Sequence, residues 1–356
     1  MTDIMFASWP GRGGDLNPFI RSFVDSIEKQ GFNVASLSMI PFDTLPDGLE
    51  GLPQGSGIVI HWPQFMYRDS FGKLAKVATL VRFIAFLKQL KKSGVRVIWI
   101  CHDLKPHDWN AWHWQALWWA TLRAMLLLSD SIIALSPGTR EVVAQRYPAW
   151  IRGRLEWAWH PKYEDVLTDA STRIRTRESM SVGGADRLVG FFGQIRLQKG
   201  VEDLIDAFSL IKEPDIHLMI AGAPLGAAVS VSENVSAMAE NDRRIHAIFR
   251  KLEDEELRDL VSACDLCVFP YREYTHSGAM IYSLSAHRRI LTPRTPFSAS
   301  LAEVLPEWVD LYDGALTPQI LRASTLRETP DTPPDLSAFS AERLARKVIE
   351  ITGEIQ

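Results

Sequence analysis

Residues 191–208 read FFGQIRLQKGVEDLIDAF and predict a strand, a turn and a helix in immediate succession. The strand prediction rests on the apolar run over residues 188–192, and the helix prediction on the apolar spacing over residues 200–211. A glycine stands at each end of the turn, at Gly193 and Gly200. A strand that leads through a short turn into a helix is the repeating unit of doubly wound α/β domains.

This turn also has the chemistry of an anion site. A turn that opens a helix presents backbone N–H groups and the positive end of the helix dipole to a ligand. Arg196 and Lys199 place two cationic side chains at the same position, and arginine can hold a phosphate through two parallel hydrogen bonds. The plain alternative is a connecting turn whose charges are solvated. A Walker loop is excluded, because G-x-x-x-x-G-K-[ST] is absent from the chain.

The same alternation of strands and helices runs through both halves of the chain. Continuous apolar runs are typical of parallel strands that are covered on both faces. In the N-terminal half, strands are predicted over residues 4–8, 32–37, 57–61, 95–101 and 131–135, with a helix over 18–30. In the C-terminal half, strands are predicted over 188–192, 216–221, 244–249 and 265–269, with helices over 200–211, 253–263, 277–286 and 340–352. The predicted fold class is therefore α/β, with doubly wound domains.

The length of 356 residues fits two domains rather than one. Residues 161–186 are polar and rich in Thr, Arg and Ser, without an apolar period, so we place the linker there. The predicted domains are residues 1–160 and residues 187–338. The last segment, 339–356, is predicted as a helix that could pack back on the N-terminal domain.

Composition excludes several classes of protein. Hydrophobic residues make up 46% and charged residues 23%, the balance of a globular chain, and a formal charge of −4 argues against a nucleic-acid binder. Three cysteines exclude a disulfide-stapled fold. Cys264 and Cys267 have C-x-x-C spacing, which allows a redox or metal site. We favour the alternative in which Cys264 ends a helix and Cys267 lies in a buried strand. No signal peptide or membrane-spanning stretch is found, so we expect a cytoplasmic protein.

Charge and tryptophan are unevenly distributed. Residues 61–126 contain ten Lys/Arg and three Asp, a charge of +7 that leaves −11 for the remainder, and five of the 12 Trp fall within residues 109–119. The helix predicted over 73–92 has a broad apolar face and basic residues on the rest of its surface, a pattern typical of helices on anionic membrane surfaces. Core packing is the alternative. The candidate acceptor or membrane surface comprises Lys73, Lys76, Arg82, Lys88, Trp112, Trp114 and Trp118.

Histidines and aspartates follow the predicted strand over 95–101. His102 and Asp103 come directly after it, at the strand end where ligands of open α/β sheets gather. Such side chains can act as acid and base, and Asp103 is the first candidate for a general base. His61, at the end of an earlier strand, ranks second, and a metal site built from these residues is a weaker alternative. After the first strand, the Gly-rich turn over 11–15 brings Gly14 and Asp15 near a ligand, with a helix N-cap as the alternative role of Asp15.

Four segments in a fixed order resemble one family. Residues 191–208, 220–222, 253–270 (EDEELRDLVSACDLCVFP) and 271–291 (YREYTHSGAMIYSLSAHRRIL) are similar to signatures of glycosyltransferase family 4 and related exopolysaccharide enzymes. The resemblance covers about residues 188–292. In the N-terminal half it is limited to the Gly-rich first turn and the histidine after the fourth strand. It implies the GT-B fold, in which two Rossmann-like domains face a central cleft.

The resemblance also implies roles for individual residues. Arg196 and Lys199 would hold the diphosphate of a nucleotide-sugar, Glu273 would approach the donor sugar, and His102 would lie beside the donor. The full candidate donor site is Gly193, Arg196, Lys199, Phe249, Arg250, Glu273, Ser277 and Gly278, with Gly14 from the first turn; the candidate catalytic residues are Asp103, His102 and Asp15. The chain departs from the family at Ile281–Tyr282, where a ribose-binding Glu is usual, and at His287, which replaces a typical Gly.

The resemblance implies a glycosyltransferase that moves a hexose from a GDP- or UDP-sugar to a glycan acceptor. A polyprenyl-diphosphate-linked oligosaccharide of exopolysaccharide or cell-surface polysaccharide synthesis is the expected acceptor, reached at the inner face of the cytoplasmic membrane. No cofactor is expected, and no metal, because the chain lacks the D-x-D pattern of metal-dependent glycosyltransferases. Two alternatives stay open: a nucleotide-sugar epimerase of GT-B shape, and a catalytically silent docking subunit of a polysaccharide assembly complex.

Overall fold

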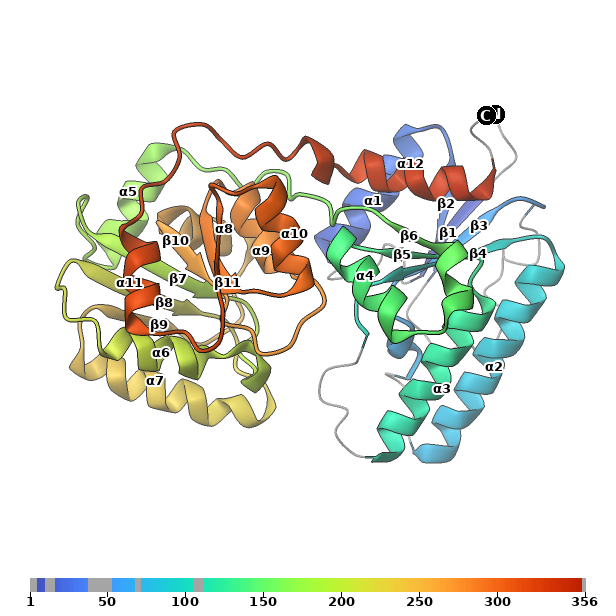
Figure 1. The fold of residues 1–356 in the computed structure, drawn as a ribbon, viewed down its shortest axis with the longest axis horizontal. Coiled ribbons are helices and arrows are strands. Elements are labelled where there is room, and N and C mark those ends of the chain that lie inside the picture. The colour runs from blue at the N-terminus through green and yellow to red at the C-terminus, as the bar shows by residue number, and fades with distance from the viewer. Residues whose placement is uncertain (1–4, 10–16, 38–52, 68–71, 105–111, 354–356) are drawn as a thin grey trace. The chain divides into compact units, whose positions relative to one another are not determined.

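The computed structural model describes residues 5–9, 17–37, 53–67, 72–104 and 112–353. The chain divides into two compact units. The first comprises residues 1–161 and 337–356, and the second comprises residues 162–336. Each unit is a parallel sheet covered by helices, so the α/β class predicted from the apolar runs is confirmed (Figure 1).

The described part of the first unit contains a six-stranded parallel sheet in the order β2-β1-β3-β4-β5-β6. Its central strands are buried along almost their whole length, because valine and isoleucine side chains point to both covered faces. The strands are β1 (Met5–Trp9), β2 (Asn33–Ser36), β3 (Gly57–Ile60), β4 (Arg96–Cys101), β5 (Ser131–Ala134) and β6 (Leu155–Trp157).

Helices cover both faces of this sheet (Figure 1). On one face, α2 (Lys73–Lys92) and α3 (Trp112–Leu128) pack with Trp99 and Phe83 in a shared apolar core. On the other, α1 (Pro18–Lys29) packs beside α12 (Ala341–Thr352), so the C-terminal helix belongs to the first unit. The remaining helices are α4 (Pro137–Arg146) and the short 3₁₀ helices η1 (Pro63–Tyr67), η2 (Ala149–Arg154) and η5 (Ser337–Phe339).

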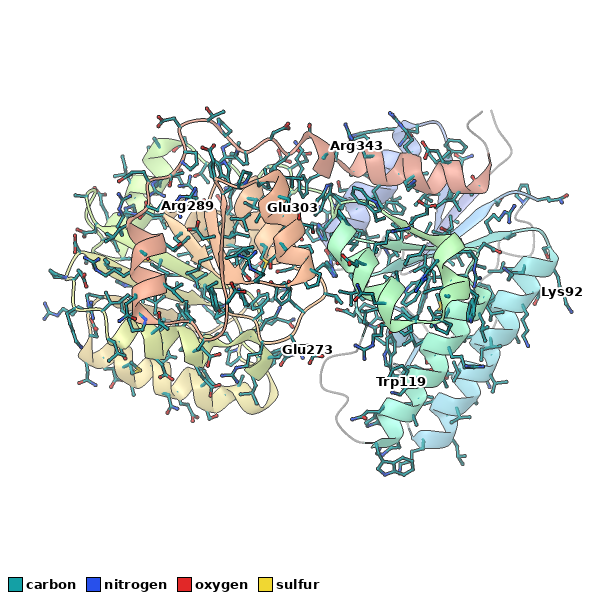
Figure 2. All side chains as sticks on the ribbon, viewed as in Figure 1. Lys92, Trp119, Glu273, Arg289, Glu303 and Arg343 are labelled. Carbon is teal, nitrogen blue, oxygen red and sulfur yellow. The ribbon has the colours of Figure 1, made fainter. Side chains whose placement is uncertain are left out.

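The second unit also has a six-stranded parallel sheet, in the order β12-β11-β10-β7-β8-β9. Its strands are β7 (Arg187–Phe192), β8 (Ile216–Ala221), β9 (Ile245–Ile248), β10 (Leu266–Val268), β11 (Arg289–Pro293) and β12 (Val309–Tyr312). Its helices are α5 (Ala170–Ser179), η3 (Leu197–Lys199), α6 (Val201–Ser209), η4 (Gly226–Ala228), α7 (Val229–Asn241), α8 (Asp254–Ala263), α9 (Gly278–Ser285), α10 (Pro296–Val304) and α11 (Pro318–Leu326). Arg289 lies within this unit (Figure 2).

The linker prediction for residues 161–186 was wrong, since the second unit begins at Lys162 and includes α5. This helix is attached by charged side chains rather than by an apolar stripe. Arg173 and Arg177 both reach Asp265, with N–O distances of 2.5 and 3.0 Å, and Arg177 also donates to the carbonyl of Ala263 at 2.9 Å. Because arginine makes these contacts, the segment lacks the apolar period by which a docked helix is recognised.

Cys264 and Cys267 are both buried free cysteines. Cys264 caps the C-terminus of α8, and Cys267 lies in β10. The interpretation of this pair as part of a helix end and a buried strand is therefore confirmed. Within the described ranges, no group of three His, Cys, Asp or Glu side chains has the arrangement of a metal site.

Candidate functional site

The glycine-bounded turn of the second unit has a backbone that only glycine tolerates. Gly193 follows β7 with a φ of +118°, and Gly200 precedes α6 with a φ of +64°. A Cβ on Gly200 would lie 2.0 Å from the carbonyl oxygen of Pro270, and one on Gly222 would lie 1.8 Å from that of Gly193. The ends of β7, β8 and β10 are therefore brought together by direct backbone contact.

Two cations lie on this turn. The Arg196 guanidinium donates to Gln194 Oε1 from Nε at 3.2 Å and from Nη2 at 3.0 Å. The Lys199 ammonium lies 3.6 Å from the centre of the Tyr271 ring, a distance at which cation and ring attract each other. Both side chains are only partly buried, so they can reach a ligand. Such a pair, at the carboxyl end of a parallel strand, suits an oxyanion.

Ser277 and Gly278 lie at the start of α9, in the same edge of the sheet. Ser277 is the N-cap, and its hydroxyl accepts a hydrogen bond from the Met280 backbone N–H at 3.3 Å. The Tyr271 hydroxyl also bonds to Ser277, while burial raises the pKa of Tyr271. Tyr271 therefore touches Lys199 with its ring and Ser277 with its hydroxyl. It joins the cationic turn to the N-terminus of α9, and the sequence reasoning did not identify it.

The remaining predicted donor residues surround this edge. Glu273 is exposed in the loop between β10 and α9 (Figure 2). Phe249 is half-buried just after β9, and Arg250 beside it is exposed. The Arg250 guanidinium donates to Glu256 Oε2 at 2.7 Å. This ion pair raises the pKa of Arg250 and lowers that of Glu256.

Two departures from the family pattern have visible structural consequences. Tyr282, next to the position of the usual ribose-binding Glu, packs its ring against Tyr163 and Phe192 at centroid distances of 5.2 and 5.7 Å. Burial raises the pKa of Tyr282 to about 12. His287 has a φ of +55°, in the left-handed region where glycine is favoured, which accounts for the glycine that the family usually has there.

In the first unit, a chain of polar side chains crosses the carboxyl ends of β1, β3 and β4. His61 Nδ1 lies 3.2 Å from His102 Nε2, and His61 Nε2 lies 3.2 Å from Ser8 Oγ. His61 follows β3 and His102 follows β4, and both are buried. The structure thus joins the two histidines that the strand ends predicted, and it adds Ser8, which sequence reasoning missed.

Aromatic rings enclose this imidazole pair. Trp62 stacks on His102 with centroids 4.0 Å apart, and Phe19 meets the same ring edge-on at 4.7 Å. Burial lowers the pKa of His61 to about 3, and that of the neighbouring His160 to about 4. These two imidazoles are therefore neutral at pH 7, and a neutral imidazole can both accept and donate a proton.

Asp103, a further candidate catalytic residue, lies at the end of β4. Asp103 is half-buried next to His102. Burial raises the pKa of the Cys101 thiol, and the charge of Asp103 raises it further. Asp15 and Gly14 lie outside the described residues. The carboxyl edge of the first sheet therefore holds a carboxylate beside two imidazoles.

The candidate acceptor or membrane surface is only partly a surface. Lys73, Arg82 and Lys88 are exposed on α2, and Trp112 on α3 is 78% exposed. The prediction was wrong for Trp118, which is 4% exposed and donates from Nε1 to the carbonyl of Leu104 at 3.1 Å. It lies about one turn beyond the half-buried Trp114, on the same side of α3, and this side packs into the apolar core of the first unit.

Trp114 is intermediate. It is half-buried, and the Lys76 ammonium lies 4.1 Å from the centre of its ring. Around it, α2 and α3 lie side by side (Figure 1), and several of their apolar side chains are exposed. We call these the α2–α3 apolar patch: Leu74, Val77, Val81, Trp112 and Trp119. In the described ranges, no helix has the length and apolar character needed to cross a bilayer.

Comparison with known proteins identifies the family. Residues 186–316 match the family described as Glycosyl transferases group 1. The GDP-mannose:glycolipid 4-beta-D-mannosyltransferase of Xanthomonas campestris pv. campestris is 30% identical over 339 residues, which are 90% of this chain and 88% of that protein. This likeness extends over both units, not only over the segment that carries the donor signatures.

Solved structures show the same fold. Anabaena HepE in complex with UDP superposes with a TM-score of 0.63 at 13% identity, covering 99% of this chain and 97% of that one. WaaG, a glycosyltransferase of lipopolysaccharide biosynthesis, superposes with a TM-score of 0.60 at 14% identity, covering 99% and 98%. The chain therefore belongs to the group 1 glycosyltransferases and is a glycosyltransferase of the GT-B fold.

Proposed function

We propose that this glycosyltransferase transfers a hexose from a nucleotide-diphosphate-sugar to a lipid-linked glycan of a cell-surface or secreted polysaccharide. The observation that carries the proposal is the cationic turn with Arg196 and Lys199, joined through Tyr271 to the N-terminus of α9. The Xanthomonas relative, which uses GDP-mannose and a glycolipid by its name, makes GDP-mannose the first donor to test. A UDP-sugar is the second, since the superposed HepE structure holds UDP.

The proposed role of the turn is to stabilise the departing nucleoside diphosphate. When the bond between the anomeric carbon and the phosphate oxygen breaks, negative charge grows on that oxygen. Lys199, Arg196 and the N–H groups at the start of α9 supply positive charge for it. We propose that these groups perform this task without a bound metal ion.

The acceptor hydroxyl must lose its proton as its oxygen attacks the anomeric carbon. We propose that Asp103, or His102 beside it, accepts this proton in the first unit. The neutral imidazole of His61 lies within hydrogen-bond distance of His102 and can set its tautomer. General base catalysis of this kind contributes about 10²–10⁴ in rate.

We further propose that the α2–α3 apolar patch and the lysines around it rest on an anionic membrane at the cytoplasmic face. Exposed Leu74, at 87%, and Trp112 would enter the interface, while Lys73 and Lys88 would meet lipid phosphates. This surface would bring the enzyme to a lipid-linked acceptor.

A thermal-shift panel of GDP-mannose, UDP-glucose, GDP, UDP and the free sugars tests the proposal. A donor at 100 times its Kd should stabilise the protein by about 2.7 kcal/mol. A labelled donor that shifts the melting temperature should then pass its label to a glycolipid extract. Conversion of the donor to an epimer without an acceptor would instead identify an isomerase, and the absence of both binding and turnover would identify a silent subunit.

A further inference from the structure

A cavity of about 430 Å³ opens in the second unit at the carboxyl ends of β10, β11 and β12. Asp203 and Asp206 of α6 form one wall, and Tyr271, Arg272, Tyr312 and Leu316 form much of the rest. Its size falls within the range of small-molecule sites, and the ends of parallel strands are where such sites lie. Among its lining residues, Tyr271 contacts Lys199 and Ser277 through its side chain, and the Arg272 backbone N–H donates to the carbonyl of Gln198 in the turn at 2.9 Å.

The charges around the cavity favour a neutral ligand. The Arg272 guanidinium is already paired with Asp203, donating from Nη2 at 2.7 Å and from Nε at 3.0 Å. Asp206 is exposed, and its carboxylate has no hydrogen bond or ion pair within the part of the chain that the structure describes. The cation is therefore compensated and one carboxylate is not, an arrangement that repels anions and can accept hydroxyl protons.

Tyr312 contributes a phenol to the wall of the cavity. The residue is only 7% exposed, and it is one of the cavity walls. Among the described residues, its hydroxyl has no hydrogen-bond partner, and its oxygen is not one of the fully enclosed polar atoms, so it is accessible to a ligand. Burial, assisted by the charge of Asp203, raises the pKa of Tyr312, so the group keeps its proton and can both donate and accept.

The remaining walls are apolar and partly aromatic. The rings of Tyr271 and Tyr312, together with Leu316, present surfaces on which C–H groups can pack, because an aromatic face is electron-rich. A hexopyranose has this combined requirement: C–H groups on its faces and hydroxyls around its rim. An elongated alkyl ligand would offer no hydrogen-bonding group to Asp206 or to the Tyr312 hydroxyl.

We propose that this cavity is a subsite for one uncharged hexose unit of the glycan acceptor, held by the Tyr312 hydroxyl and Asp206 against the ring of Tyr271. The proposal rests on the proposed function, since it assigns the cavity to the acceptor of that reaction. The same Tyr271 ring contacts Lys199, so occupation of the subsite is coupled to the cationic turn through one side chain. A filled subsite would hold Tyr271 in place and, through it, Lys199.

Sugar binding to the whole protein tests this subsite directly. The probes are methyl β-D-glucoside and methyl β-D-glucuronide, which differ by one carboxylate, with cellobiose as a longer neutral probe, measured by saturation-transfer NMR. We expect the neutral sugars to bind more tightly than the glucuronide. Tyr312→Phe, which removes only the hydroxyl, should weaken neutral-sugar binding about three- to tenfold. Leu316→Trp, which fills the cavity, should abolish it.

The matched control is Tyr147→Phe in the first unit. Tyr147 is also a buried tyrosine whose hydroxyl lacks a partner, so its variant undergoes the same chemical change away from the cavity. Its sugar binding should equal that of the unmodified protein. Melting temperatures of all variants show whether they fold, and Tyr312→Phe remains informative if Leu316→Trp does not.

Three outcomes separate this proposal from the proposed function. Sugar binding that is unchanged in both Tyr312→Phe and Leu316→Trp overturns the subsite, even if glycosyl transfer proceeds normally. Binding that is lost in Glu273→Gln but not in Tyr312→Phe places the sugar at the donor position and also overturns it. Tyr312-dependent sugar binding in a protein that transfers no sugar supports the subsite and refutes the proposed function alone.

Discussion

The two sheets present different chemistry at their carboxyl edges. In the first unit, this edge holds His61 and His102 enclosed by aromatic rings, buried and, for His61, with a pKa lowered to about 3. In the second unit, it holds Arg196 and Lys199, which are only partly buried. The same doubly wound architecture thus places buried imidazoles at this edge of one sheet and partly exposed arginine and lysine side chains at this edge of the other.

The difference follows from the residues that enclose each edge. Burial favours a neutral imidazole, because a low-dielectric environment penalises the charged form. The second unit leaves its two cationic side chains near water and sets Lys199 against the Tyr271 ring, whose face attracts a cation. Proton transfer needs a group that can change charge, whereas binding a diphosphate needs groups that do not.

The largest effect should come from the proton-accepting group of the first unit. Asp103→Asn should lower kcat by about 10²–10⁴, because the amide cannot accept the proton of the acceptor hydroxyl. Donor binding, measured by thermal shift, should not change. Glu141→Gln, which neutralises an exposed carboxylate on α4, is the control. If Asp103→Asn keeps full activity while His102→Gln loses it, the base is His102.

The next effect should appear in the second unit. Arg196→Ala and Lys199→Ala should each lower kcat/KM for the donor about 10- to 150-fold, since a hydrogen bond to a charged group contributes about 1.5–3 kcal/mol. Arg243→Ala and Lys212→Ala, which remove exposed cations from the loops leading into β9 and β8, should leave it unchanged. An effect of less than twofold for both site variants would refute the donor assignment.

The buried histidine predicts a pH dependence of stability. The folded pKa of His61, about 3, lies below its ordinary value of 6.5, so the unfolded chain binds a proton that the folded chain does not. Proton binding to the unfolded chain therefore leaves the free energy of unfolding unaffected above about pH 6.5. As the pH drops from 6.5 towards 3, it lowers that free energy by about 1.4 kcal/mol per pH unit. Urea unfolding at several pH values between 4 and 8 measures this dependence, and the free energy of unfolding should change less steeply with pH in His61→Gln. An unchanged slope would mean that the imidazole is already solvated.

The smallest effects should come from the α2–α3 apolar patch. Trp112→Ser should weaken binding to anionic liposomes while changing the free energy of unfolding by no more than about 0.5 kcal/mol, because the side chain is exposed. Trp118→Ser should do the reverse, with a loss of stability of about 3–5 kcal/mol, since its ring is buried. Equal liposome binding by the Trp112 variant would exclude this patch from membrane contact.

How far the sequence predicts the fold depends on the kind of contact. The helix Lys73–Lys92 was predicted with its observed bounds, and nine of the twelve strands in the described part of the chain within one or two residues, because apolar runs report burial directly. The strands β6, β11 and β12 were not predicted. Helix α5 was missed, since arginines rather than apolar residues dock it. Trp118 was misassigned, because composition does not tell which face of a helix meets the sheet.

The site shows the same limit. The glycines and cations of the turn over 193–200 are adjacent in sequence, so their pattern predicted a strand–turn–helix anion site. The pairing of His61 with His102 spans 41 positions, and only the order of the strands brings them together. Tyr271 has no motif of its own. Only the tertiary fold brings it between Lys199 and Ser277.

Calorimetric titration of GDP and UDP tests the central claim most directly, that the charged edge of the second unit holds the nucleoside diphosphate. The protein, the double variant Arg196→Ala/Lys199→Ala and the double control Lys212→Ala/Arg243→Ala would be compared at one ionic strength. The account predicts that one nucleotide binds the protein and the double control equally, and that the site variant loses at least about tenfold in affinity. Equal affinity of the site variant would contradict it.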